Sequence, residues 1–441
     1  MHKQEIMENT SPLKRLWQLI FLDKKEISSI YFYAILSGLV QLTVPLGVQA
    51  IIGFVLGASM VTSIYVLIIV VVLGVFTVGI MQINQMKIIE KIQQNIFTRY
   101  AFQFADTIPR FDLKKMDNYY LPVKVNQFFD TLSVQKSLSK LLLDIPTASI
   151  QLLFGLILLS LYHPVFIAFG FLLLFILWVI LKFTGKNGLK TSMEESTYKY
   201  NVVAWLQEMS RIIKSFKFSQ GTHINLTKTD KNVVGYLTSR TAHFKVLVFQ
   251  YKSLVIFKVI ITTAMLTVGT YLLLSQQLNI GEFIAAEIVI LTVINAVEKL
   301  IGSLDSVYDT ITGLEKLASV IESPLEKDGA MPYVSNQKGI SVEMLDFNFK
   351  YHHGQQVLKN VNLKIPANSI VCISGNEGSG KSTFLKVLTG NYSDFDGAIL
   401  LNNIPIGNYQ LESLRSKIGI YLNQQDLFVG SVWENISFGR K

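Results

Sequence analysis

The sequence predicts an all-α membrane domain with six spans, followed by a smaller α/β domain. Three observations favour this fold class. Only 16% of the 441 residues are charged, whereas soluble chains average about 25%. Long stretches contain no charge at all, and the hydrophobic pattern becomes strand-like after Pro324. The single cysteine, Cys372, excludes a disulfide framework and any multi-cysteine metal site.

The uncharged stretches have the length of membrane spans. Residues 27–86 contain no Asp, Glu, Lys or Arg, and a helix needs about 20 apolar residues to cross a bilayer. This stretch therefore predicts two crossings, with a turn in residues 57–63. Residues 145–181 predict a second pair that is interrupted at 162–164, because proline disfavours helical geometry in the preceding residue. The fifth and sixth spans are expected at residues 259–281 and 283–304, which places the membrane domain at 27–323.

The distribution of charge predicts the orientation of these spans. Lysine and arginine occur in residues 1–26, in the connection 87–140 and in the connection 182–258, but not in the three short hairpin tips. Positive charge marks the cytoplasmic side. We therefore expect an integral plasma (bacterial inner) membrane protein with both termini in the cytoplasm and lipid as a partner. Topology accounts for the net charge of +9, so we expect no nucleic-acid partner.

The two long connections are predicted to continue the spans as helices beyond the bilayer. The apolar residues of the first recur at a spacing near 3.6, as helices require: Ile88, Ile89, Ile92, Ile96, Tyr100 and Phe104. The helices are expected to turn back in residues 109–122 and 205–221. The alternative is that these extensions are solvated stalks with no further role.

A second domain begins after residues 324–339, which hold two prolines and two glycines without periodicity and are expected to form a linker. Residues 340–351, 361–366 and 369–374 are typical of strands, the last of them buried. The segment GNEGSGKST at 375–383 follows directly, and a helical stretch follows it. The domain 340–441 is therefore expected to have an α/β fold.

The segment 375–383 matches the P-loop pattern G-x-x-x-x-G-K-[ST]. Glycines let backbone N–H groups converge on a phosphate, and the following helix presents its positive N-terminus to it. Lys381 is expected to neutralise the β- and γ-phosphates of ATP, and the Ser382 hydroxyl to ligate Mg²⁺. The alternative is a glycine-rich turn with an incidental lysine. The predicted ATP-binding residues of the loop are Gly375, Asn376, Glu377, Gly378, Ser379, Gly380, Lys381, Ser382 and Thr383.

Six spans with long extensions, followed by a P-loop domain, resemble the ABC exporter family. Phe349-Lys350-Tyr351 is similar to the family's F-x-Y stretch, which implies that Tyr351 stacks on adenine; an ordinary strand aromatic is the alternative. LRSKIGIYLNQQDLFVGSVWENI at 414–436 is similar to the family's Q-loop region. The family's glutamine position falls on Asn423, but Gln424 is the expected residue to reach Mg²⁺. Glu377 departs from the family pattern, which usually has a small uncharged or hydroxyl residue at this position. A carboxylate beside phosphates is unfavourable unless it points outward to solvent.

The resemblance also implies a function. It implies ATP-driven export of an unidentified substrate by one half of a dimer, with a second half-transporter as partner. The turns at 109–122 and 205–221 resemble the coupling helices that dock on the nucleotide-binding domain. Glu208 and Lys214 match the family's loose E-x-x-x-x-x-K pattern in the second coupling helix, at residues 205–221.

The match stops at Lys441, before the family's signature sequence, the acidic strand end and the switch histidine. We therefore expect an incomplete P-loop domain, cut after the Q-loop, that hydrolyses ATP poorly or not at all. The incomplete domain also allows a different function. The chain could be a non-transporting membrane protein that binds nucleotide as a regulatory or scaffold subunit, or an inert fragment.

A few polar residues of the membrane domain allow two interpretations. Glu287 either contacts a cationic or polar cargo, or is solvated in a hydrated cavity or near the outer surface. Glu298 and Lys299 are expected to form a structural pair or to face water. His163, beside Pro164, is expected to be a turn residue.

Overall fold

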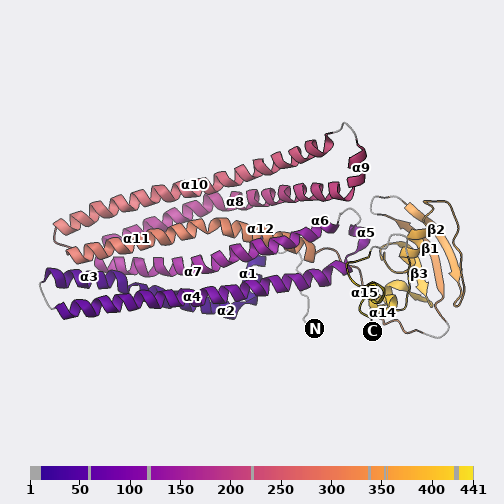
Figure 1. The fold of residues 1–441 in the computed structure, drawn as a ribbon, viewed down its shortest axis with the longest axis horizontal. Helices are drawn as coiled ribbons and strands as arrows, with labels where there is room; N and C mark the ends of the chain where they lie inside the picture. Colours follow the sequence, from indigo (N-terminus) through magenta and orange to yellow (C-terminus); the bar gives the residue numbers. More distant parts are fainter. Residues whose placement is uncertain are drawn as a thin grey trace. The chain divides into compact units, whose positions relative to one another are not determined.

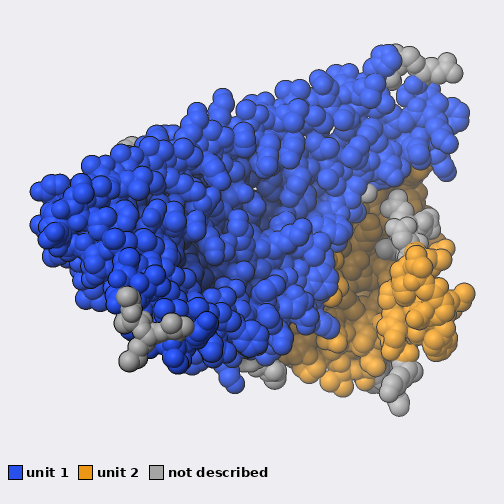
Figure 2. Space-filling view, turned by 60° about the vertical axis from the view of Figure 1, so that its left-hand side comes forward, with its two compact units in different colours: residues 1–104, 122–322 blue, residues 105–121, 323–441 orange. Residues whose placement is uncertain are grey.

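A computed structural model describes most of the chain in two compact units. Unit 1 comprises residues 1–104 and 122–322, and unit 2 comprises residues 105–121 and 323–441; Figure 2 shows them in different colours. The described residues are 11–57, 61–116, 121–219, 223–335, 339–351, 354, 356–421 and 427–440.

Unit 1 is a bundle of long helices that lie along one another (Figure 1). Six helical segments are long and apolar enough to cross a membrane, which confirms the predicted six spans. The three longest helices have 47, 47 and 51 residues. At 1.5 Å per residue each is about 70 Å long, whereas the hydrocarbon core is about 30 Å thick, so the predicted helical extensions are confirmed. The helices of this unit are α1 Pro12–Leu22, α2 Lys24–Gln41, α3 Thr43–Leu56, α4 Val61–Thr107, α6 Leu121–Val125, α7 Asp130–Tyr162, α8 Val165–Arg211, α9 Ile213–Phe218, α10 Ile224–Leu274, α11 Ile280–Gly302 and α12 Leu304–Ile321.

The turns between spans lie where local chemistry favours them. Helix α7 ends at Tyr162 and α8 begins at Val165, whose N–H donates to Nδ1 of His163 over 3.2 Å. Before α11, Asn279 and Glu282 form a reciprocal capping box, with N···O distances of 2.8 and 2.9 Å. The tip between α3 and α4 lies partly outside the described residues, at 58–60. The first span also contains a break at Leu42, between α2 and α3, that the sequence pattern did not predict.

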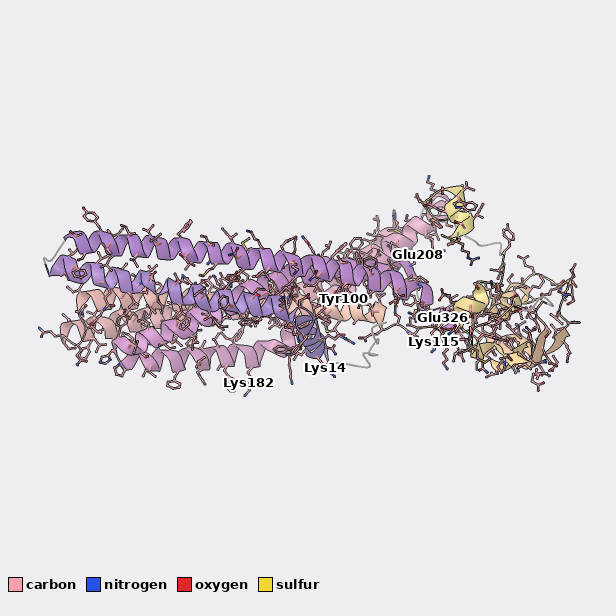
Figure 3. The ribbon with its side chains drawn as sticks, turned by 90° about the horizontal axis from the view of Figure 1, so that it is seen from below. Lys14, Tyr100, Lys115, Lys182, Glu208 and Glu326 are labelled. Carbon is pink, nitrogen blue, oxygen red and sulfur yellow. The ribbon has the colours of Figure 1, made fainter. Side chains whose placement is uncertain are left out.

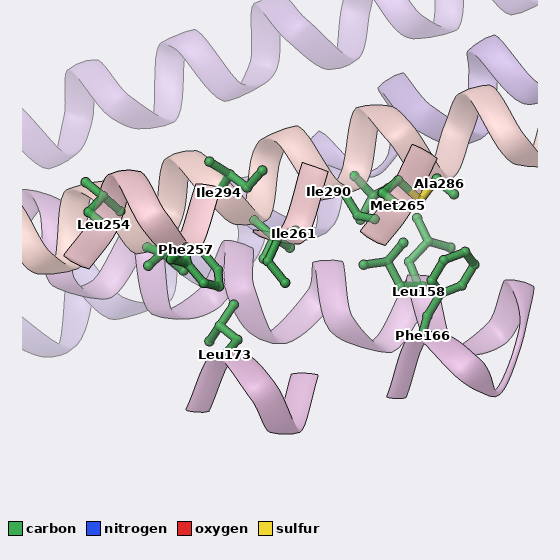
Figure 4. Packing of buried hydrophobic residues seen from close by; sticks show 14 of the residues in the cluster. Leu158, Phe166, Leu173, Leu254, Phe257, Ile261, Met265, Ala286, Ile290 and Ile294 are labelled. Atoms are coloured by element: carbon green, nitrogen blue, oxygen red, sulfur yellow. The ribbon is translucent and has the colours of Figure 1, made fainter. Parts of the chain in front are cut away.

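The interior of unit 1 is formed by apolar side chains of α7, α8, α10 and α11. Figure 4 shows part of this cluster, which includes Phe166, Phe257 and Met265, each at most 2% exposed. Small residues allow close helix contacts, as is common between membrane helices: a Cβ at Gly155 would lie 2.7 Å from Cγ2 of Val293. The outward faces are also apolar, for example on α4, which suits contact with lipid rather than with water.

Unit 2 contains a four-stranded antiparallel sheet in the order β2-β1-β3-β4. Its core joins Phe347 and Phe349 of β1 to Val387 of α13 and Leu414 of α14. Strands and helices in one small core confirm the α/β fold class. The elements are α5 Leu113–Met116, β1 Val342–Lys350, β2 Gln356–Ile365, α13 Lys381–Leu388, β3 Asp396–Leu401, β4 Ile404–Pro405, α14 Leu411–Arg415 and α15 Val432–Ser437.

The buried strand expected at residues 369–374 is wrong for this structure. The segment has no assigned strand, and none of β1 to β4 pairs with it. Ile370, Val371 and Ile373 are 103%, 50% and 41% exposed. An apolar run becomes a strand only when a neighbouring strand accepts its backbone hydrogen bonds, and no described strand lies beside this run.

Candidate functional site: the P-loop and its neighbours

The loop 375–380 depends on glycine conformations that other residues rarely adopt. Gly378 and Gly380 have φ angles of +79° and +91°, in the region that favours glycine. A Cβ at Gly380 would lie 2.9 Å from Cγ1 of Val357 on β2. The loop therefore lies close to the sheet, and helix α13 begins directly after it at Lys381. The free N–H groups of the first turn of α13 point towards the loop, as an anion site requires.

The side chain of Lys381 folds back over this loop. Its Nζ donates to the carbonyl oxygens of Gly375 and Asn376, each over 2.8 Å. The ammonium group is thus held at the mouth of the loop, where a phosphate would exchange these carbonyl contacts for charged ones. Ser382 and Glu377 are exposed. The Glu377 side chain is therefore accessible to solvent.

Tyr351 lies beside the P-loop helix. Its hydroxyl is 2.8 Å from Oγ1 of Thr383, on the first turn of α13. Its ring contacts those of Phe349 and Tyr392 edge-on, at centroid distances of 5.2 and 5.8 Å. The structure therefore brings Tyr351 and Thr383 together. The role of Tyr351 towards adenine stays a prediction.

The residues of this site fit a nucleotide triphosphate better than a metal ion alone. Among the described residues, no group of three or more His, Cys, Asp or Glu side chains could hold a metal ion. A Mg²⁺ at this site would take its ligands from phosphate oxygens, water, the Ser382 hydroxyl and the predicted Q-loop residue Gln424. Asn423 and Gln424, the predicted Q-loop residues, lie outside the described residues.

Residues 105–121, from the connection after the second span, belong to unit 2. Nζ of Lys114, on the short helix α5, is 2.9 Å from Oδ2 of Asp394 and 2.7 Å from its carbonyl oxygen. The hydrogen bond from Lys114 lowers the pKa of the Asp394 carboxyl below its usual value. Lys114 is also 5.5 Å from the ring centroid of Phe349, within the range of a cation–π contact.

These contacts form a continuous series from the connection to the P-loop helix. Lys114 lies over Phe349, Phe349 packs against Tyr351, and Tyr351 bonds to Thr383. The backbone supports the same arrangement, since Phe111 bridges to Leu325. Sequence analysis placed a turn here but did not identify Lys114 or Asp394. The pattern DLKKM, with Asp112 capping the N–H groups of the two lysines, was a local signal for a short helix.

The second predicted turn, 205–221, contains the end of α8 and the short helix α9 in unit 1. Glu208 forms an ion pair of 2.5 Å with Arg211 one turn later, and Figure 3 labels Glu208 near this end of α8. Lys214 is exposed on α9. Trp205 closes the turn, because its Nε1 donates to Oγ1 of Thr229 on α10 over 3.2 Å. Glu208 and Lys214 are not joined to each other by any described hydrogen bond or ion pair.

The polar residues of the last span have specific environments. Glu298 pairs with Lys258 of α10 and accepts a hydrogen bond from Tyr251. Of the two expectations for Glu298 and Lys299, a pair between them is not formed, because adjacent residues of a helix point apart. Lys299 is instead exposed, in line with the second expectation. Glu287 is half-buried on α11, which leaves both of its interpretations open.

Comparison with known proteins supports the nucleotide-binding assignment of unit 2. Residues 358–440 match the family model of the ABC transporter. An ATP-dependent lipid A-core flippase from Xanthomonas campestris is 30% identical over 178 residues, which are 40% of this chain and 30% of that protein. The mitochondrial iron-sulfur clusters transporter ATM1 of Saccharomyces cerevisiae is 36% identical over 119 residues, which are 27% and 16% of the two chains. The matched segment thus spans about a third of the flippase and less of the yeast protein.

Structural comparison extends the similarity from unit 2 to the membrane domain. A solved bacterial Atm1-family ABC exporter with ATP bound superimposes with a TM-score of 0.77 at 16% identity. The similarity covers 95% of this chain and 74% of that one. At this identity the likeness concerns the fold. Together with the family match, it confirms the resemblance that the sequence motifs indicated: the chain has the architecture of an ABC exporter, with a six-helix membrane domain fused to an ABC transporter domain.

Proposed function

We propose that this chain binds ATP at residues 375–383 and uses it to drive export of an as yet unidentified substrate. The observation that carries this proposal is the geometry of the P-loop. Two left-handed glycines, a lysine folded over the loop and a following helix form the arrangement that phosphate binding requires. The whole loop from Gly375 to Thr383 is described, and Tyr351 is joined to its last residue by a hydrogen bond to Thr383.

Each residue has a separate role in this proposal. Lys381 binds the β- and γ-phosphates, Ser382 ligates Mg²⁺ together with Gln424, and Tyr351 orients the adenine. ATP supplies the free energy of binding and of cleavage of its terminal phosphate. The contacts of Lys114 with Asp394 and Phe349 would connect this site to the membrane spans.

The membrane arrangement completes the proposal. The chain would act as one half of a homo- or heterodimer, with two nucleotide sites closing on ATP and the helices switching the access of a central cavity. In this proposal the basic connections, the P-loop domain and both termini would lie in the cytoplasm, on the inner side of a plasma membrane. Relatives named as a lipid A-core flippase and an iron-sulfur clusters transporter show that this architecture serves chemically different substrates, so the substrate class stays open.

Photo-labelling with an azido derivative of ATP in native membranes tests nucleotide binding. Lys381→Ala is expected to reduce labelling about tenfold or more, because removing a buried or charge-assisted phosphate contact costs on the order of 1.5–3 kcal/mol. Lys386→Ala, on the same helix, is a matched control that should label normally. Undiminished labelling of Lys381→Ala would exclude the proposed site. Normal labelling without ATP-dependent transport in vesicles would favour the non-transporting alternative.

A further inference from the structure

One face of helix α8 carries aromatic side chains that are followed by lysines where the fourth span ends. Phe171, Phe175 and Trp178 are each more than half exposed. Lys182 and Lys186 come next and are also exposed. These five positions recur at spacings of three or four residues, so they lie on the same side of the helix. Figure 3 labels Lys182 at the outer edge of the bundle.

The position of this face along α8 matches the boundary of a bilayer. Tryptophan is enriched at membrane–water interfaces, and Lys182 is the first charged residue after the charge-free stretch 145–181. At a rise of about 1.5 Å per residue, Lys182 lies about 6 Å and Lys186 about 12 Å beyond Trp178. The headgroups add a layer of about 5–8 Å on each side of the hydrocarbon core. The Lys182 ammonium group therefore falls in this layer, and the long Lys186 side chain can reach back to it.

The positive charge of this face has no counterpart in the described protein. The sequence contains no Asp or Glu between Asp144 and Glu194. Among the residues that the structure describes, neither Lys182 nor Lys186 forms an ion pair. Lys190, one turn further along α8, instead lies 4.0 Å from Glu194. Two unmatched ammonium groups at the depth of the lipid headgroups favour an anionic partner.

Trp178 positions the first of these lysines. Nζ of Lys182 is 4.6 Å from the centroid of the Trp178 ring, within the range of a cation–π contact. The ring of Phe175 stacks on Trp178 with a centroid distance of 6.2 Å and an interplanar angle of 29°. No described group accepts a hydrogen bond from Lys182, so its N–H donors remain available to a ligand. The two aromatic rings offer an apolar surface directly beside them.

We propose that this face of α8 binds an acidic phospholipid of the surrounding membrane. The lipid phosphate would accept hydrogen bonds from Lys182, Lys186 would add positive charge, and an acyl chain would lie along Phe171 and Phe175. The net negative headgroup matches the two lysines, whereas a zwitterionic headgroup also carries a cation that they repel. The aromatic residues lie at the depth of acyl chains, which an acidic partner in water does not reach. The inference depends on α8 crossing the membrane and not on nucleotide binding, so either proposal can fail without the other.

Quenching of tryptophan fluorescence by brominated lipids tests the proposal. The chain contains four tryptophans, and Trp178 becomes the only reporter in a variant with three substitutions: Trp17→Phe, Trp205→Phe and Trp433→Phe. This variant is placed in phosphatidylcholine vesicles that contain increasing fractions of brominated phosphatidylglycerol or brominated phosphatidylcholine. At low ionic strength we expect phosphatidylglycerol to be preferred about fivefold or more, because each lysine near a membrane surface contributes about a factor of five.

Substitution of the lysines distinguishes a binding site from general attraction to the membrane. Lys182→Gln combined with Lys186→Gln should bring the preference to within about twofold of unity. Salt at about 1 M should weaken the preference when both lysines are present. Lys190→Gln is the matched control, because it removes the same charge from the same helix one turn further on, and it should keep the preference.

Trp205→Phe could impair folding, because Trp205 closes the turn between α8 and α10. Native mass spectrometry of the chain with all four tryptophans avoids this difficulty. The variant that lacks both Lys182 and Lys186 should then retain less phosphatidylglycerol than Lys190→Gln. Equal quenching by the two lipids, or a preference that survives the double substitution, would overturn the proposal. Absence of quenching by either lipid would also overturn it, because protein, such as a second copy of the chain, would then cover this face.

Discussion

At the scale of single residues, Gly380 is the position where backbone conformation and close packing coincide. Its φ of +91° and the 2.9 Å approach to Val357 both exclude a side chain. We expect Gly380→Ala to destabilise unit 2 by about 1–3 kcal/mol and to abolish nucleotide binding, because the N–H groups of the loop would no longer converge. The shift of the unfolding temperature on addition of Mg-ATP measures both effects.

Gly407→Ala is the control for that substitution. Gly407 has no atom within 4 Å of an added Cβ and no positive φ, so this variant should keep both its stability and its nucleotide response. If Gly380→Ala behaved in the same way, the loop would not require the conformation seen here.

Tyr351 offers a second test at residue scale, because its ring and its hydroxyl have separate partners. The ring packs against Phe349 and Tyr392, whereas the hydroxyl bonds to Thr383. If the ring stacks on adenine, Tyr351→Phe should keep the nucleotide Kd within about threefold, and Tyr351→Ala should raise it about tenfold, since aromatic stacking contributes about 1–3 kcal/mol. Fluorescent-nucleotide titration distinguishes them. Equal Kd values for both variants would argue against the adenine role.

Local sequence predicted the P-loop but not the contacts around it. The conformation of residues 375–383 depends on residues only a few positions apart, so the spacing of these residues alone identifies a P-loop. Lys114 and Asp394 are separated by 280 positions, and their contact depends on how the chain folds over that distance. No pattern within a single sequence carries that information, and for the same reason the pairing of Glu298 with Lys258 was missed.

At the scale of elements, the contact of α5 with Asp394 predicts how the stability of unit 2 depends on pH. The pKa of Asp394 is lowered by Lys114 from a usual value of 3.8. Its folded-state pKa therefore lies below the unfolded one, so the stabilisation is present above about pH 4 and disappears as the pH falls through the lowered value. Because the Asp394 side chain is 64% exposed, screening limits the contribution to about 1 kcal/mol or less.

Thermal unfolding measures this effect. Asp394→Asn should lower the stability slightly and equally from pH 5 to pH 8, and the difference from the unaltered chain should shrink below pH 3.8 and in high salt. Asp396→Asn, at a residue without an ion pair to any described residue, serves as the control. A difference that grew towards acid pH would contradict the assigned direction of the pKa shift.

Elements differ in how far the sequence could predict them. The membrane spans could be predicted from the charge-free stretches, because the backbone hydrogen bonds of a membrane helix all lie within its own segment. The strand expected at 369–374 failed because a strand needs a neighbour, which its own residues do not specify. The break at Leu42 lies within an unbroken apolar run, where Pro45 in the first turn of α3 was the one available local signal.

At the scale of the whole molecule, charge distribution and helix length jointly support one orientation. The long helices α4, α8 and α10 extend beyond the apolar stretches at the ends that carry the basic connections. The opposite ends are short turns, at residues 163–164 and 275–279, that contain no lysine or arginine. An extended end must lie in water, and the positive charges favour the cytoplasm for it. In the proposed orientation, the nucleotide site would lie on the cytoplasmic side, where ATP is available.

Cysteine accessibility in intact cells tests this orientation directly. Cys372 is the only cysteine, so Cys372→Ser provides a background without thiols. On that background Gln276→Cys, in the short turn after α10, should react with a membrane-impermeant maleimide from outside the cell. Lys217→Cys, on the exposed surface of α9, should react only after the membrane is permeabilised. Because both sites are exposed, a difference in labelling reports the side of the membrane and not burial, and the reverse pattern would place the P-loop domain outside the cell.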